Sequence, residues 1–216
     1  MFKKIREEIA LIKERDPAAK SSLEIFFLYP GFKAVRMYRR AHKLYQRGHF
    51  FLARWQGERC RKKTGIEIHP GAKIGKGLLI DHGSGVVIGE TAEIGDCCTI
   101  YQGVTLGGTG KDTGKRHPTI GNNVVIGAGA RILGPFKVGD YAKIAAGAVV
   151  LEEVPPYATA VGVPARVVRV AGKPVGKPQD LDQVHTPDPV AQELCKLQLR
   201  LEHLEQRLTG ENPGEN

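Results

Sequence analysis

The sequence lacks the apolar segments of membrane and exported proteins. No stretch approaches the roughly 18 consecutive apolar residues of a membrane helix. The first fifteen residues are charged and amphipathic and include no apolar core of a signal peptide. We therefore expect a cytoplasmic protein without membrane contact.

Cysteines are also few. The 216 residues include four, Cys60, Cys97, Cys98 and Cys195. Their spacing fits neither a disulfide framework nor a paired zinc-ligand motif, and we expect no metal. We expect Cys97 and Cys98 on one strand, where adjacent side chains point to opposite faces, with Cys98 packed in the core.

Acidic residues are scarce in the first part of the chain. Residues 1–64 contain 17 Lys and Arg against 6 Asp and Glu, whereas the remainder contains 15 against 17. A basic segment can bind nucleic acid, an acidic partner or a phosphorylated ligand. No zinc-finger spacing or RNA-binding signature accompanies this charge. We therefore interpret it as a solvated helical face and expect no nucleic-acid partner.

The basic segment shows helical periodicity. We predict helices over residues 2–15, after Ser21 or Ser22, and over 32–47 and 49–63. We expect the larger apolar side chains of the last two helices to form a core: Phe32, Val35, Tyr38, Leu44, Tyr45, Phe50, Phe51, Leu52 and Trp55.

A six-residue repeat begins after Thr64-Gly65. Its aliphatic positions are Ile68, Ile74, Ile80, Ile88, Ile94, Ile100, Leu106, Ile120, Ile126, Ile132, Val138, Ile144 and Val150. Short extended segments separated by turns return a side chain to the same face after six residues. Three such segments per coil give a parallel β-helix of roughly four to five coils, with the aliphatic residues stacked inside.

The repeat slips twice, and each slip places a histidine beside a charged residue. The first slip contains Asp81 and His82, and the second is a Gly-rich stretch that ends at Arg116 and His117. Histidine suits a general base near neutral pH. Glu67, fifteen residues before His82, would stack beside it and orient it. Arginine suits binding of a carboxylate, and the stretch is not a Walker A motif.

The repeat fades after Val150, and we predict a Pro- and Gly-rich linker over residues 171–189. A heptad pattern follows at Val190, Leu194, Leu197, Leu201, Leu204 and Leu208. This pattern predicts an amphipathic helix over 190–209. It is too short to be stable alone, so it indicates an oligomer that brings such helices together.

Seven short runs resemble serine O-acetyltransferases of the hexapeptide-repeat acyltransferase superfamily. They are residues 15–19 (RDPAA), 64–72 (TGIEIHPGA), 80–83 (IDHG), 89–91 (GET), 103–111 (GVTLGGTGK), 115–118 (KRHP) and 161–166 (VGVPAR). The resemblance extends over residues 10–170. It implies an α+β fold with an N-terminal helical domain over 1–64 and a left-handed parallel β-helix over 65–170.

The resemblance also implies a reaction: transfer of acetyl from acetyl-CoA to the hydroxyl of L-serine, the first step of cysteine biosynthesis. No residue is an obvious acyl carrier, so we expect direct transfer without an acetyl-enzyme. The resemblance assigns His82 as general base and Glu67 as its orienting carboxylate. Asp16 and Asp81 would hold the substrate amino group, and Arg116 and His117 its carboxylate. The residues it places along acetyl-CoA are Gly108, Thr109, Lys111, Ala128, Lys143, Ala146 and Arg166.

The resemblance further implies a homotrimer with sites between subunits; a dimer of trimers stays open, and cysteine is a possible feedback inhibitor. The family often ends in an isoleucine that docks into O-acetylserine sulfhydrylase, whereas this sequence ends Gly214-Glu215-Asn216, which leaves open whether the tail docks there or forms a coiled coil. The alternatives are a sugar or antibiotic acetyltransferase, a zinc carbonic anhydrase on the same scaffold, and a nucleic-acid-binding scaffold protein. The anhydrase would need three convergent histidines.

Overall fold

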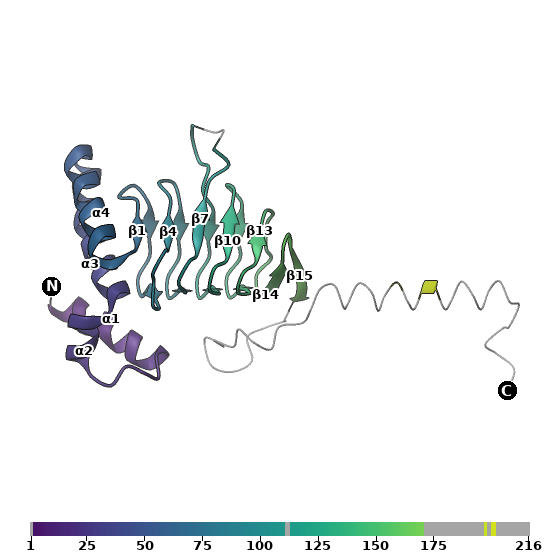
Figure 1. The fold of residues 1–216 in the computed structure, drawn as a ribbon, viewed down its shortest axis with the longest axis horizontal. Helices are drawn as coiled ribbons and strands as arrows, with labels where there is room; N and C mark the ends of the chain where they lie inside the picture. The colour runs from purple at the N-terminus through teal and green to yellow at the C-terminus, as the bar shows by residue number, and fades with distance from the viewer. Residues whose placement is uncertain (1, 111–112, 171–196, 198–199, 202–216) are drawn as a thin grey trace, which may run out of the picture.

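The computed structural model describes residues 2–110, 113–170, 197 and 200–201, and shows helices followed by a coil of short strands (Figure 1). The helices are α1 (Phe2–Arg15), α2 (Ser22–Leu28), α3 (Pro30–Gln46) and α4 (Phe50–Thr64). The linker predicted over 171–189 and nearly all of the helix predicted over 190–209 lie outside the described residues.

The strands form three parallel sheets along the coil, with one antiparallel strand at the end. Sheet A is β1 (Glu67–Ile68), β4 (Val87–Ile88), β7 (Thr105–Gly107), β10 (Arg131–Leu133) and β13 (Val149–Val150). Sheet B is β2 (Lys73–Ile74), β5 (Glu93–Ile94), β8 (Thr119–Ile120) and β11 (Lys137–Val138). Sheet C is β3 (Leu79–Ile80), β6 (Thr99–Ile100), β9 (Val125–Ile126), β12 (Lys143–Ile144), β14 (Ala158–Gly162) and the antiparallel β15 (Ala165–Val170).

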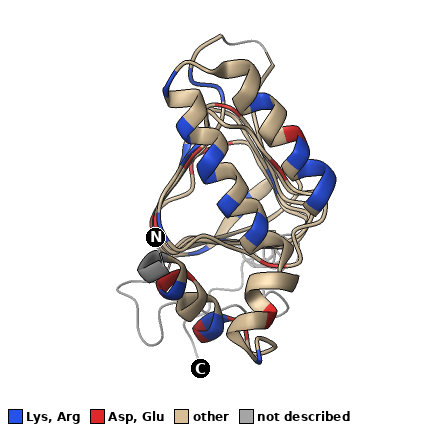
Figure 2. Ribbon diagram, turned by 90° about the vertical axis from the view of Figure 1, so that its left-hand side faces the viewer, with Lys and Arg blue, Asp and Glu red and all other residues tan. Residues whose placement is uncertain are grey.

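The strand register follows the aliphatic repeat. Ile68 pairs with Ile88, Ile88 with Leu106, Leu106 with Ile132, and Ile132 with Val150. These side chains are at most 3% exposed, and full burial of one such side chain contributes about 1.5–3 kcal/mol. The predicted parallel β-helix with an aliphatic interior is therefore confirmed, and Figure 2 shows its three-sided outline from the helical end.

The register also shows where the two slips of the six-residue repeat lie in the structure. Partners along sheet A are normally 18 residues apart, but Ile68 and Ile88 are 20 apart and Leu106 and Ile132 are 26 apart. The first insertion widens the corner between sheets C and A at residues 81–86. The second forms the loop of residues 108–118, which leaves the corner between sheets A and B.

Cys97 and Cys98 lie in the turn before β6, so the prediction that they share a strand is wrong. Strands here are two or three residues long, and Cys97 takes a left-handed turn conformation with φ 57°. The prediction that Cys98 packs in the core is confirmed, because its side chain is fully buried and its Sγ lies 3.0 Å from the carbonyl oxygen of Gly121. Burial raises the pKa of this thiol to about 12.

Helix α3 crosses the first coil and supplies hydrogen-bond donors to its open end. The Tyr38 hydroxyl donates to the carbonyl of Ala72 at 2.5 Å, and the Arg39 guanidinium donates to the carbonyls of Ile74 and Gly75. The start of a β-helix leaves such backbone groups unpaired. At its N-terminal end the helix lies directly on β3, because a Cβ on Gly31 would collide with the Ile80 carbonyl.

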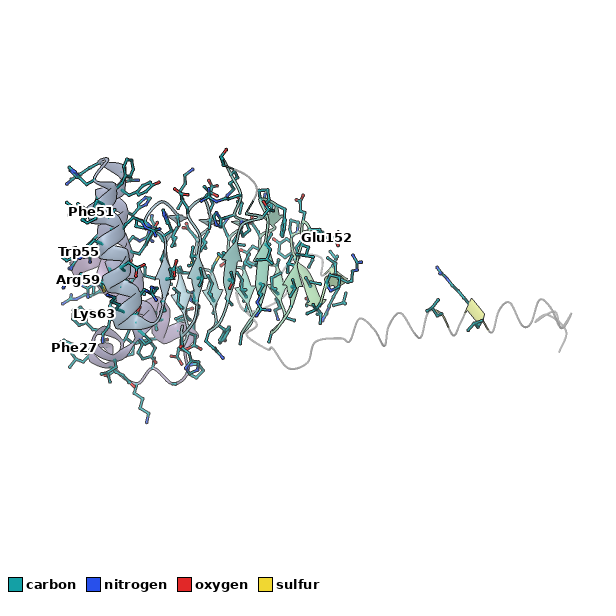
Figure 3. All side chains as sticks on the ribbon, turned by 45° about the horizontal axis from the view of Figure 1, so that its top comes forward. Phe27, Phe51, Trp55, Arg59, Lys63 and Glu152 are labelled. Atoms are coloured by element: carbon teal, nitrogen blue, oxygen red, sulfur yellow. The ribbon has the colours of Figure 1, made fainter. Side chains whose placement is uncertain are left out.

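The expectation that the aromatic residues of 49–63 form a core is wrong. Phe51 is 82% exposed and Trp55 52%, and Phe50 and Leu52 are also exposed. Helix α4 packs through the small residues Ala53 and Cys60, which leaves the larger side chains outside. Figure 3 shows Phe51, Trp55, Arg59 and Lys63 along the outer face of α4. Phe32, Val35 and Tyr38 of α3 are buried as predicted.

Candidate active site

The first insertion presents Asp81 and His82 at the corner between sheets C and A. His82 is exposed and takes a left-handed conformation with φ 55°, followed by Gly83 at φ 79°. In the corresponding turns of later coils the left-handed residue is a glycine: Gly103, Gly129 or Gly147. The two extra residues therefore project an imidazole from an edge whose other corners turn on glycine, with Tyr101 and Gln102 as the large side chains of the next corner.

The strand register does not align Glu67 with His82, and the stacking of their side chains stays a prediction. Glu67 pairs with Val87, twenty residues later, because the insertion lengthens this coil. The Glu67 N–H donates to the Val86 carbonyl at 2.9 Å, so the strand that carries Glu67 runs beside the end of the corner. Among the described residues no hydrogen bond is found between the Glu67 and His82 side chains.

The edge between sheets C and A continues as a column of glycine turns. The N–H groups of Gly103, Gly129 and Gly147 donate to the carbonyls of the previous corner, each at 2.8 Å. A Cβ on Gly129 or Gly147 would meet no atom within 4 Å, so the outer surface here is open. Ala128 and Ala146 lie in these corners. The structure thus places His82, Ala128 and Ala146 in corners along one edge.

Asp16 lies just after α1 and is held by two hydrogen bonds. Its Oδ1 accepts from the Ala18 N–H at 2.8 Å, and its Oδ2 accepts from the Tyr29 hydroxyl at 2.6 Å. Burial raises the pKa of Tyr29, and the negative charges of Asp16, Glu24 and Asp81 act in the same direction. The charges of Asp16 and Asp81 therefore both reach the Tyr29 phenol. The sequence reasoning missed Tyr29, whose only signal was its place before Pro30.

His117 is buried at the base of the second insertion. It is 8% exposed, and a Cβ on Gly89 would collide with its ring. The Thr91 N–H donates to Nδ1 of His117 at 3.2 Å, so the neutral ring carries its proton on Nε2. Burial lowers the pKa of His117, and the charge of Arg116 lowers it further. Thr91 was not predicted, although its hydroxyl oxygen also accepts the N–H groups of Arg116 and His117 at 3.1 Å.

Arg116 is held by an ion pair rather than free. Its Nη2 lies 2.5 Å from Oε2 of Glu90, and the two side chains are 26% and 34% exposed. This contact lowers the pKa of Glu90, whose Oε1 also accepts from the Tyr45 hydroxyl at 3.1 Å. Tyr45, Glu90 and Lys115 line a pocket of about 290 Å³. The hydrogen bond between Tyr45 and Glu90 was not predicted, because it joins helix α3 to the coil.

The remaining predicted residues are spread over three regions. Gly108 packs against Arg116, and Thr109 is exposed on the loop, whereas Lys111 lies outside the described residues. Lys143 begins β12 in sheet C. Arg166, in β15, forms an exposed ion pair with Glu152 at 3.2 Å, and such surface pairs contribute about 0–1 kcal/mol.

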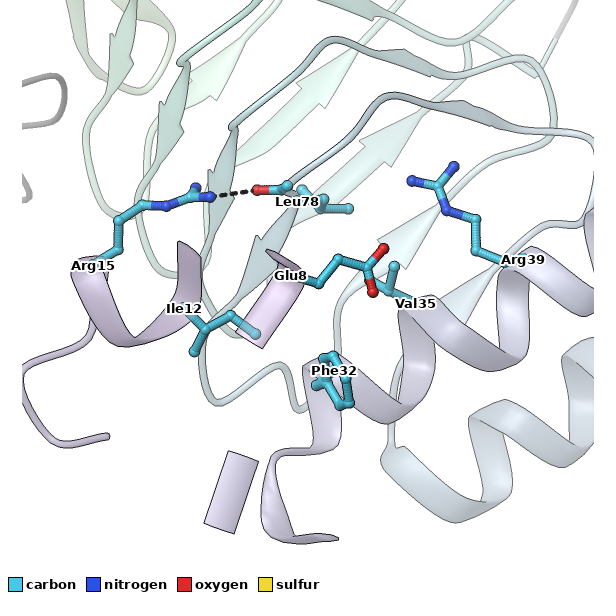
Figure 4. Close-up of a pocket in the computed structure, with 8 residues that line it drawn as sticks. Glu8, Ile12, Arg15, Phe32, Val35, Arg39 and Leu78 are labelled. Atoms are coloured by element: carbon cyan, nitrogen blue, oxygen red, sulfur yellow. Dashed lines mark hydrogen bonds between the residues drawn. The ribbon is translucent and has the colours of Figure 1, made fainter. Parts of the chain in front are cut away.

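A narrow crevice beneath α1 has a structural explanation (Figure 4). Arg15 donates to the carbonyls of Gly77 at 2.7 Å and Cys97 at 3.2 Å. Arg39 lies on the opposite wall and donates to the first coil. These two guanidinium groups thus tie the helices to the coil. Within the described ranges no group of three or more His, Cys, Asp and Glu side chains is arranged to hold a metal ion, and no helix is long and apolar enough to span a membrane.

Known proteins identify the family. Residues 117–152 match the family model described as bacterial transferase hexapeptide (six repeats). The chain is 51% identical to serine acetyltransferase of Synechococcus elongatus over 212 residues, which is 98% of this chain and 86% of that protein. It is 52% identical to serine acetyltransferase of Staphylococcus aureus over 94% of each chain. The chain belongs to the serine acetyltransferase family.

Solved structures of this family have the same fold. Neisseria gonorrhoeae serine acetyltransferase gives a TM-score of 0.77 at 43% identity, over 84% of this chain and 69% of that one. Soybean serine acetyltransferase complexed with serine gives 0.75 at 49% identity, over 77% and 68%. A serine acetyltransferase in complex with cysteine gives 0.79 at 44% identity, over 83% and 69%. The expected helical segment and left-handed β-helix are confirmed, and the chain is an acetyl-CoA-dependent acyltransferase.

Proposed function

We propose that the protein transfers acetyl from acetyl-CoA to the hydroxyl of L-serine, which yields O-acetyl-L-serine and CoA for cysteine biosynthesis. The observation that carries this proposal is the exposed His82 in a two-residue insertion, at the end of an open glycine-lined edge, in a chain of this family. The serine-bound soybean neighbour supports the choice of acceptor. We place the reaction in the cytoplasm, without nucleic-acid or membrane partners.

In the proposed mechanism His82 is the general base. It removes the hydroxyl proton as the serine oxygen bonds to the thioester carbonyl carbon. The tetrahedral intermediate then collapses, the carbon–sulfur bond breaks, and the imidazolium returns the proton to the CoA thiolate. A positioned base contributes roughly 10²–10⁴-fold. Glu67, whose strand runs beside the corner, would orient the imidazole; hydrogen bonds of this kind often tighten only when substrate is bound.

The two ends of serine would bind to residues on different edges of the β-helix. We propose that Asp16 and Asp81 hold the ammonium group, and that Arg116 and His117 bind the carboxylate. Because one chain carries these pairs at separate corners, a complete site needs the C–A edge of one subunit beside the A–B loop of the next. Three copies around a threefold axis satisfy this at every site, so we propose a trimer. A dimer of such trimers is compatible with the same sites.

Acetyl-CoA would extend from His82 along the glycine-lined edge. Bare corners at Gly129 and Gly147 allow a long chain to approach the backbone near Ala128 and Ala146. We assign Gly108 and Thr109 of the neighbouring loop to the same ligand. Its phosphates would meet the cationic residues Lys111, Lys143 and Arg166.

We also propose the division into a helical domain (1–64), a catalytic β-helix (65–170), a linker (171–189) and a C-terminal helix (190–209). Cysteine differs from serine by sulfur in place of the hydroxyl oxygen, and the cysteine-bound neighbour supports cysteine as a feedback inhibitor at the serine site. We do not propose a complex with O-acetylserine sulfhydrylase.

The deciding experiment measures CoA release with L-serine and with sugar acceptors. We expect turnover with serine, and a loss of at least about 10²-fold in kcat for His82→Ala with a native circular-dichroism spectrum. Retained activity in that variant would overturn the base assignment. Turnover of a sugar but not serine would overturn the proposed acceptor.

A further inference from the structure

Tyr29 lies beside Asp16 and near Asp81, the two acids proposed to bind the substrate ammonium group. It lies between α2 and α3, and Gly31, two residues later, packs directly on the Ile80 carbonyl. Asp81 follows Ile80 at once. The packing contact between Gly31 and Ile80 therefore places Tyr29 close to the corner that carries Asp81 and His82.

The ring and the hydroxyl of Tyr29 have separate partners. The half-buried ring packs against a small apolar cluster that includes Ile25, Phe32 and Leu79. The hydroxyl donates to Oδ2 of Asp16 at 2.6 Å, the short distance of a hydrogen bond to a charged acceptor. Packing thus fixes the ring, and the hydroxyl fixes one carboxylate oxygen of Asp16.

The other oxygen of Asp16 is also fixed, because Oδ1 accepts from the Ala18 N–H. A carboxylate offers about four lone-pair directions, so two remain for a substrate. These two hydrogen bonds fix the orientation of the half-exposed Asp16 carboxylate before a ligand binds, so the two free lone pairs already point in set directions. This preorganisation lowers the entropy lost when a ligand binds.

We propose that Tyr29 is a positioning residue that orients Asp16 toward the substrate ammonium group and so sets the preference for an amino-bearing alcohol. This inference rests on the proposed function of the site. Tyr29 does not touch the reacting atoms, so it acts on serine binding rather than on the chemical step.

The test compares Tyr29→Phe with Tyr38→Phe. Both remove one hydroxyl from the α3 region, but the Tyr38 hydroxyl donates to the Ala72 backbone and serves stability alone. We expect Tyr29→Phe to raise the KM for L-serine about tenfold, as for loss of a hydrogen bond to a charged group. The KM for acetyl-CoA should stay unchanged, and kcat should change less than about twofold. Tyr38→Phe should lower the melting temperature without changing either KM.

A second readout separates positioning from general damage. In an Asp16→Asn background, Tyr29→Phe should have little further effect on the KM for serine, because the two residues act as one unit. Tyr29→Phe should also reduce the preference for L-serine over 3-hydroxypropanoate, which lacks the amino group. Equal effects of the two Tyr→Phe variants, additive effects with Asp16→Asn, or an unchanged preference would overturn the role of Tyr29 while leaving serine acetylation intact. A wild-type protein that neither binds nor acetylates serine would overturn the proposed function, and this role with it.

Discussion

Gly89→Ala is expected to displace His117 without a backbone effect. Gly89 does not have a positive φ, so alanine fits its backbone, and the consequence of substitution is steric. The new Cβ would overlap the His117 ring, which is buried and tied to Thr91. Overpacking of this kind costs about 1–3 kcal/mol. For a protein of this size that corresponds to a fall of roughly 2–12 °C in the melting temperature.

The assay for Gly89→Ala combines thermal unfolding with steady-state kinetics at varied serine. We expect the lower melting temperature together with a higher KM for serine and an unchanged KM for acetyl-CoA. Gly57→Ala is the matched control, because its Cβ would make only ordinary contacts with Pro70, at 3.6 Å or more. It replaces glycine inside α4 and should gain about 0.5–1 kcal/mol. Native stability and serine KM in Gly89→Ala would refute the packing argument.

Three further predictions concern single contacts. Glu90→Gln should free Arg116 and raise the KM for serine several-fold. Because the Arg116 contact lowers the pKa of Glu90, its contribution to stability is present above the unfolded pKa of about 4.3. The melting-temperature difference from wild type should therefore shrink as pH falls below that value and vanish once pH is below the lowered native pKa. Cys98 should resist a disulfide reagent at pH 8 in the native protein and react after unfolding, and native labelling identified by mass spectrometry would contradict its burial. Glu152→Gln should shift the free energy of unfolding by less than about 1 kcal/mol, since its pair with Arg166 is exposed; a larger loss in urea titration would refute this.

The aliphatic repeat predicted the fold because the period of six reflects the geometry of a three-sided coil. The positions of its two slips also predict on which edge of the coil each inserted segment lies. The first slip follows Ile80, the third position of its coil, whereas the second follows Leu106, the first position of another coil. The order of positions thus places the two histidines on different edges. A regular coil spans 18 residues and the first coil spans 20, so the 15-residue spacing between Glu67 and His82 does not correspond to a register pair.

Contacts between residues far apart in the sequence were not predicted. The hydrogen bond of Tyr29 to Asp16 joins two loops of the helical segment, and that of Tyr45 to Glu90 joins α3 to the coil; no local pattern indicates either. The burial of α4 was also mispredicted. Its small residues Ala53 and Cys60 face α3 and the coil, so side-chain size rather than hydrophobicity decided which face was buried.

The central claim is that a complete site combines residues from two edges of the β-helix and hence from two subunits. Co-refolding of equal amounts of His82→Ala and Arg116→Ala chains tests it most directly, because each variant alone should be nearly inactive. At random assembly about one site in four would pair an intact His82 with an intact Arg116 from the neighbour, so about a quarter of wild-type kcat per site should return. If the mixture stays as inactive as its components, each site is built within one chain and the account is wrong.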